Sequence, residues 1–142
     1  MFANWKEKLT AKKAKNKAFE ESRHWKTNTL LQDRLQAMRG SCTMVPAEIH
    51  EAVITAVNIA LQENIWTEQS EIPEDFAPGM VCIVWNEAHL PVLRAPWNVV
   101  KEDLDDVRRV NSDTFLVAQS MDRILWFDSH GRIKLYSVAA ED

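Results

Sequence analysis

Glycine, proline, cysteine and long apolar runs are all scarce in this chain of 142 residues. Three Gly and five Pro exclude a collagenous or low-complexity protein. The longest apolar run, Met80 to Trp85, has six residues, whereas a bilayer-spanning helix needs about 20, so we expect no membrane segment. Cys42 and Cys82 have no second Cys at metal or redox spacing, which is typical of buried thiols in a reducing compartment.

The N-terminus also lacks the features of a targeting signal. Its lysines, from Lys6 to Lys13, are followed by no apolar stretch of the kind that a secretory signal requires. The chain has 46% apolar residues, 27% charged residues and six Trp, which indicates a folded globular protein rather than a disordered one. We therefore expect one cytoplasmic domain over residues 1–142.

Charge is distributed unevenly along the chain. The formal net charge is −4, but residues 1–40 carry ten basic and four acidic side chains, and the remainder carries seven basic and seventeen acidic ones. A basic arm on an acidic body either packs on its own domain as a solvated helix or contacts an anionic partner such as a nucleic acid. The sequence leaves both alternatives open.

The first half of the chain is predicted to be helical. Residues 1–26 are rich in Lys, Ala and Glu and predict a basic helix. A helical half over residues 27–66 follows, and its first helix begins at Thr27 or Thr29 and ends at Gly40.

The clearest predicted helix extends from Pro46 to Asn64. Pro suits the first turn of a helix, and apolar residues then recur at three and four residues. This spacing predicts one buried face, which comprises Ile49, Val53, Ala56, Val57, Ala60 and Leu61.

The second half is predicted to contain the sheet, over residues 80–138. The polar residues 67–79 contain two Pro and one Gly and predict a loop that acts as a hinge between the halves. Residues 80–85 predict a buried strand. Pro91 to Arg94 predict a short edge strand, because proline cannot donate to a strand ladder, and residues 99–110 predict one short helix.

The last segment predicts a three-strand antiparallel meander. Its apolar runs cover residues 115–118, 124–127 and 133–138, and Gly131 in the second link suits a positive φ. The fold class is therefore α+β, with N-terminal helices, then an antiparallel sheet that ends in the meander, and one short helix inserted.

No catalytic or metal-binding motif is complete in the sequence. His50-Glu51 begins like a zinc-protease helix, but Ile54 occupies the position of the second histidine ligand. Asp128-Ser129-His130 has the residue types of a nucleophilic triad, but adjacent residues in a tight turn cannot reach one another as that chemistry requires. We expect a non-enzymatic protein without metal or cofactor.

The densest acidic cluster provides a candidate partner-binding surface. It has three interpretations: a solvated first helical turn, a docking patch for a basic protein or, least favoured because exposed neighbours on one helix end rarely face each other across a cleft, a pair of catalytic carboxylates. Trp97, which sits in a predicted loop beside this cluster, is a candidate aromatic anchor. The complete set of candidate binding residues is Glu102, Asp103, Asp105, Asp106, Asp122, Asp128, Trp97 and His130.

The C-terminal third resembles a known group of proteins. The run from Asp113 to Ala118, the turn at Met121 to Arg123 and the run that ends in Asp128-Ser129-His130-Gly131 resemble the closing hairpin of small bacterial immunity proteins. These families belong to contact-dependent inhibition and other polymorphic toxin systems. The resemblance implies a small cytoplasmic protein that binds and blocks a cognate toxin, often a nuclease with a basic surface.

Two functions are therefore predicted. The first is a cytoplasmic inhibitor that neutralises a basic toxin by occluding its active site. The alternative is a nucleic-acid-associated or phage-encoded regulatory protein that acts through its Lys-rich N-terminal helix. Salt-dependent binding to DNA or RNA, lost on removal of residues 1–26, distinguishes the second from the first.

Overall fold

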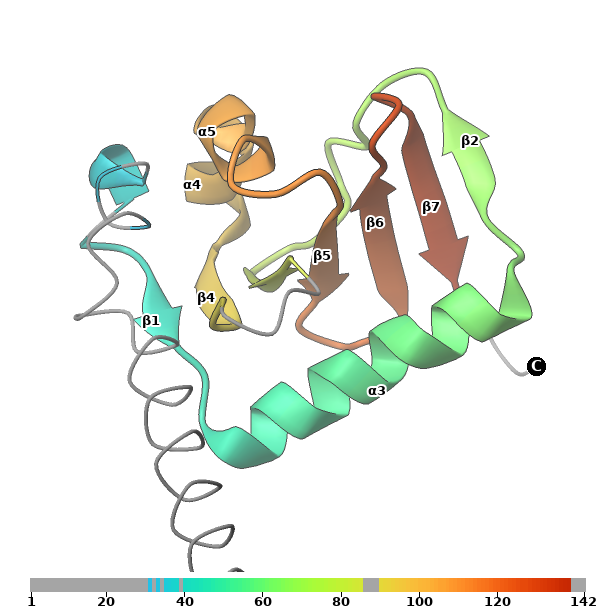
Figure 1. Ribbon diagram of the computed structural model, residues 1–142, viewed down its shortest axis with the longest axis horizontal. Coiled ribbons are helices and arrows are strands. Elements are labelled where there is room, and N and C mark those ends of the chain that lie inside the picture. The colour runs from blue at the N-terminus through green and yellow to red at the C-terminus, as the bar shows by residue number, and fades with distance from the viewer. Residues whose placement is uncertain (1–30, 32, 34, 39, 86–89, 139–142) are drawn as a thin grey trace, which may run out of the picture.

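A seven-stranded sheet forms the centre of the protein (Figure 1). The computed structural model describes residues 31, 33, 35–38, 40–85 and 90–138. The predicted basic helix over residues 1–26 lies outside this part, as does much of the next predicted helix, of which Gln36–Met38 form the 3-10 helix η1. Helices together with an antiparallel sheet confirm the predicted α+β class.

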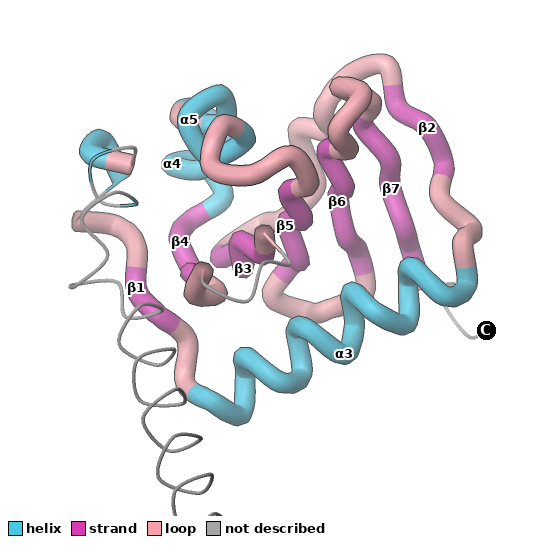
Figure 2. Tube along the Cα trace, in the orientation of Figure 1, coloured by secondary structure: helices cyan, strands magenta, loops and turns pink. Residues whose placement is uncertain are grey.

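The sheet, whose strands are drawn in magenta in Figure 2, is antiparallel at every pairing. The predicted three-strand meander and its Gly131, with φ 79°, are confirmed. From one edge to the other, the strands are β1 (Thr43–Met44), β4 (Leu93–Pro96), β3 (Met80–Val84), β5 (Thr114–Ala118), β6 (Arg123–Phe127), β7 (Ile133–Ser137) and β2 (Thr67–Gln69).

Helix α3 (Ala47–Glu63) confirms the predicted third helix. Pro46 precedes it in an extended conformation, and Asn64 ends it in the left-handed region with φ 52°, a conformation that Asn tolerates better than most residues. Val53 and Val57 are fully buried against the sheet, so the apolar periodicity identified the packed face correctly.

The sheet has a hydrophobic core on each face. Because side chains alternate along a strand, Phe115 and Val117 of β5 pack on the α3 side, and Leu116 and Ala118 pack on the opposite side. The opposite side is covered by two short helices, α4 (Trp97–Glu102) and α5 (Leu104–Arg108), together with η1. The single predicted helix over residues 99–110 is therefore two helices, separated at Asp103.

Two predictions about strands were wrong. Residues 67–79 are not entirely a loop, because Thr67–Gln69 form edge strand β2 beside β7. The predicted edge strand at Pro91 to Arg94 is displaced to Leu93–Pro96 and lies inside the sheet, between β1 and β3. The predicted helical half thus contributes edge strand β1, and the predicted loop contributes edge strand β2, so residues 67–79 are not a simple hinge between halves.

Both cysteines are free and buried, as predicted. Burial, assisted by the negative charge of Asp103, raises the pKa of the Cys42 thiol to about 11. A thiol with so high a pKa is almost entirely protonated at neutral pH and is a poor nucleophile.

Candidate functional site

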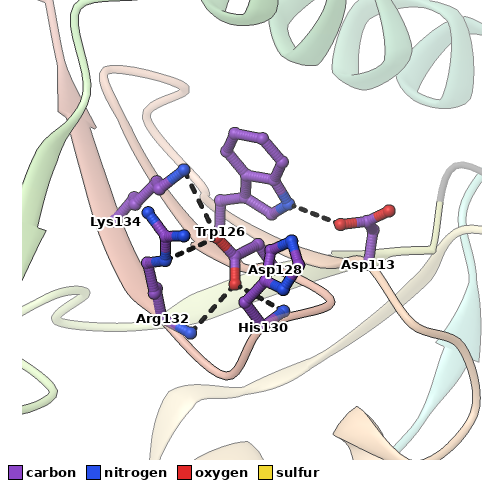
Figure 3. Close-up of polar contacts among 6 residues, drawn as sticks. All are labelled: Asp113, Trp126, Asp128, His130, Arg132 and Lys134. Atoms are coloured by element: carbon purple, nitrogen blue, oxygen red, sulfur yellow. Dashed lines mark hydrogen bonds and ion pairs between the residues drawn. The ribbon is translucent and has the colours of Figure 1, made fainter.

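The turn between β6 and β7 is organised by one buried carboxylate (Figure 3). Oδ1 of Asp128 accepts hydrogen bonds from the backbone N–H groups of His130 and Arg132, both at 2.9 Å. Its Oδ2 lies 3.3 Å from Nζ of Lys134 and 4.0 Å from Nε of Arg132. Asp128 is only 8% exposed, and its carboxylate bonds within the turn. This predicted docking residue therefore does not belong to an exposed acidic surface.

The surroundings of Asp128 favour its ionised form. Burial raises the pKa of the carboxyl group. The hydrogen bonds from Arg132 and His130 and the charge of Lys134 lower it by a larger amount, so the pKa lies below the ordinary value. A carboxylate with a lowered pKa stabilises the folded state above the pKa of the unfolded chain, and this contribution is lost as the pH falls through the folded-state pKa.

We expect Asp128→Asn to lower the free energy of unfolding at pH 7 by about 1–3 kcal/mol, because the amide cannot replace a charged acceptor. The difference in the free energy of unfolding between the variant and the parent protein should shrink as the pH falls from about 4 to below the folded-state pKa of Asp128. Urea denaturation between pH 7 and pH 2 measures it. Asp105→Asn, at an exposed carboxylate, is the control and should change stability by less than about 0.5 kcal/mol; a pH-independent loss in Asp128→Asn would contradict the electrostatic account.

A half-buried tryptophan lies beside this turn on the α3 side of the sheet. The ring of Trp126 stacks on Phe115 at 5.5 Å between centroids and 17° between planes, and Nζ of Lys134 lies 4.5 Å from its centre. Its indole N–H donates to Oδ1 of Asp113 at 3.1 Å. Lys134 therefore links the buried carboxylate to the aromatic cluster.

A hollow of about 450 Å³ separates α5 from the β6–β7 turn. We call it the α5 hollow. Both signs of charge and several hydroxyl groups occur in its walls. Its lining residues are Asp105, Arg108, Arg109, Asn111, Ser112, Thr114, Phe127, Asp128, Ser129 and Gly131.

A second hollow, of about 860 Å³, lies on the other side of α5, toward η1. Asp33, Gln36, Asp106 and Arg109 line it. Asp105 lines the α5 hollow and Asp106 lines this second one. Helix α5 is therefore a ridge between two depressions, with one carboxylate on each flank.

The predicted acidic cluster is a continuous surface on α4 and α5. Glu102 and Asp105 are exposed, and Asp103 and Asp106 are half-buried. Oδ1 of Asp106 lies 3.6 Å from Nη1 of Arg109, the one ion pair that the structure shows for these four carboxylates within its described residues. We call Glu102, Asp103, Asp105 and Asp106 the α4–α5 patch.

The remaining predicted binding residues do not all join this patch. His130 is exposed in the β6–β7 turn, which shares the α5 hollow with Asp105. Asp122 lies in the β5–β6 turn, at the opposite end of those strands, where it accepts a hydrogen bond from Ser120.

Trp97 is not an exposed anchor. It begins α4, is 5% exposed, donates its indole N–H to the carbonyl of Glu74 at 3.1 Å, and packs edge-on against Phe76. The preceding Pro96, taken from the sequence as part of a loop, is instead the last residue of β4. Trp97 therefore belongs to the core on the α4–α5 side.

Sequence reasoning missed the polar residues that line the α5 hollow beneath α5. Thr114 is 1% exposed, and its Oγ1 has no hydrogen-bond partner in the described part of the chain. The guanidinium of Arg108 lies 4.8 Å from the centre of the Phe127 ring. The sequence did indicate Arg108, because it is a basic residue at the end of a helix that begins with acidic residues. It could not indicate Thr114, because the position of Thr114 depends on its pairing with Phe127.

The Asp128-Ser129-His130 sequence is a turn and not a triad. The carboxylate of Asp128 accepts the backbone N–H of His130 and does not orient its ring. Across residues 31–138, apart from the positions left undescribed, no group of three His, Cys, Asp or Glu side chains is placed to hold a metal ion. In the same part of the chain no helix is long and apolar enough to cross a bilayer.

No protein-family model matches the chain, and no curated protein is significantly similar to it. The fold and the site define it as a small α+β protein in which α5, with Asp105 and Asp106 in its first turn and Arg108 in its last, forms a ridge between two surface hollows.

Proposed function

We propose that the protein is a cytoplasmic immunity protein that binds a basic toxin and covers its active site. The observation that carries the proposal is the shape and charge of the α4–α5 patch. Asp105 and Asp106 lie on a ridge flanked by two hollows, and a partner that fits this relief brings its cations against carboxylates.

The patch is supported from below by the core. Val100, Leu104 and Val107, on the inner sides of α4 and α5, are buried at 0–6% exposure. Short helices fixed in this way hold the carboxylates in place before a partner arrives, which lowers the entropic cost of binding. In a nuclease, the lysines and arginines that contact substrate phosphates would be the groups that pair with the patch.

We expect the triple variant Glu102→Lys, Asp103→Lys and Asp106→Lys to fold and to fail in protection. Each reversal, at the exposed Glu102 or at the half-buried Asp103 and Asp106, costs the free protein a few tenths to about 1 kcal/mol, whereas like charges across an interface cost several kcal/mol. Association with the toxin should slow by at least about tenfold, and added salt should reduce the difference. The measurements are the survival of cells that express a candidate toxin, and melting of the free variant.

The matched control is the variant Glu51→Lys, Glu71→Lys and Glu74→Lys. These three exposed residues lie outside the patch, and their reversal changes the net charge by the same amount. Full protection by the control together with loss in the patch variant supports the proposal. Full protection by a folded patch variant excludes the patch from the interface.

A second candidate is regulation through nucleic acid, favoured by the ten basic residues within positions 1–40. All ten of these basic residues lie outside the described residues. Salt-dependent binding of the full chain to DNA or RNA, abolished by deletion of residues 1–26, would favour this function over toxin neutralisation.

A further inference from the structure

The α5 hollow has features of a ligand site that the docking of a protein on the α4–α5 patch does not explain. Its volume of about 450 Å³ falls within the range of about 300–1,000 Å³ typical of small-molecule sites. Donors reach it from three separate segments, because Arg108 ends α5, Ser112 precedes β5, and Ser129 lies in the β6–β7 turn. A ligand group in the hollow would therefore meet donors on several sides rather than on one.

The buried hydroxyl group of Thr114 is the strongest indication. Strand alternation places Thr114 on the same face as Leu116, which packs on the α4–α5 side. Thr114 also lines the α5 hollow. The residue is 1% exposed, and its Oγ1 has no partner among the described residues. An unpaired buried hydroxyl group is costly, so native proteins retain few of them without a function.

The charges around the hollow favour an anion. Arg108 contacts the Phe127 ring and, within the described residues, has no carboxylate at ion-pair distance. The carboxylate of Asp128 is already compensated by Lys134, Arg132 and two backbone N–H groups. Asp106 pairs with Arg109, so Arg108 is the lining cation that the exposed Asp105 faces.

We propose that the α5 hollow binds a phosphate group of a small phosphate ester. Arg108 would supply the charge-assisted hydrogen bonds, and the hydroxyl groups of Thr114 and Ser129 would donate to the remaining oxygens. The Ser112 hydroxyl would join them by exchanging its bond to Oδ1 of Asn111, 3.4 Å away, for one to the ligand. Donors that converge from several directions suit a tetrahedral oxyanion better than a planar carboxylate. This inference does not depend on the proposed immunity function, because it concerns the free protein.

Inorganic phosphate is the probe, with acetate and chloride at matched ionic strength as controls. We expect phosphate to raise the melting temperature in a saturable manner and to shift the NMR resonances of the Arg108 side-chain N–H and the Thr114 amide. Acetate and chloride should do neither. An absent phosphate effect, or an equal and saturable effect of acetate, would overturn the proposal.

Thr114→Val distinguishes a ligand site from a structural role. The variant removes an unpartnered hydroxyl group, so without phosphate it should melt a few degrees higher than the parent protein. Its affinity for phosphate should nevertheless fall at least about tenfold, as should that of Arg108→Gln. Lys101→Gln removes one positive charge from exposed α4 and should bind phosphate as the parent does. Unchanged affinity in both hollow variants would overturn the proposal.

Discussion

Val53→Asp is expected to abolish cooperative folding. Val53 is fully buried between α3 and the sheet, in the core that contains Val57 and Phe115. Burial of an unpaired carboxylate there costs several kcal/mol, and the whole domain is stabilised by only about 5–15 kcal/mol. Loss of the thermal transition in circular dichroism would be the direct measurement.

The control for this variant is its neighbour on the same helix. Ala52 is exposed, so Ala52→Asp introduces the same charge with only the propensity cost of less than about 1 kcal/mol. Normal melting of Ala52→Asp beside an unfolded Val53→Asp assigns the effect to burial. A Val53→Asp protein that melts like the parent would show that the inner face of α3 does not support the fold.

Trp97→Ala is expected to have the second-largest effect, a loss of about 3–5 kcal/mol in the free energy of unfolding. The substitution leaves a cavity beside Phe76 and leaves the carbonyl of Glu74 without its indole donor. Urea denaturation followed by far-ultraviolet circular dichroism measures the loss without depending on tryptophan fluorescence.

Trp97→Phe separates the two contributions. It keeps an aromatic ring against Phe76 and removes only the hydrogen bond to Glu74, so we expect a loss of about 1–2 kcal/mol. If Trp97→Ala were as stable as the parent protein but failed to bind a partner, Trp97 would be a surface anchor, as its sequence context had predicted, and the packing account would be wrong.

The elements that were predicted correctly have strong local patterns. Helix α3 combines Pro46, a three-and-four apolar repeat and Asn64, and each of these features acts within one or two turns. Strands β5 and β6 contain continuous apolar runs because both faces of the sheet are covered there. Periodicity and turn chemistry were sufficient for these elements.

The elements that were missed depend on distant partners. Strands β1 and β2 have two and three residues, too few for an alternating pattern, and they exist because β4 and β7 offer free edges. The break between α4 and α5 at Asp103 occurs without Gly or Pro. No local signal marks these features.

The candidate site was predicted in the same uneven way. The α4–α5 patch is contiguous in sequence, so its proximity followed directly. Asp122 and Asp128 were grouped with it, although consecutive turns of an antiparallel meander lie at opposite ends of the strands, and this rule would have separated Asp122 from the others. The unpaired hydroxyl group of Thr114 required knowledge of what surrounds it.

Helix α3 has a consequence for the width of the sheet. It connects β1 at one edge to β2 at the other, and Figure 1 shows it crossing the sheet. Its 17 residues span about 25 Å, close to the distance of about 29 Å between the outermost of seven strands. The helix is therefore long enough to reach across most of the width of the sheet. One segment, residues 43–69, forms both edge strands of the sheet. Detachment of α3 would therefore disturb both edges together.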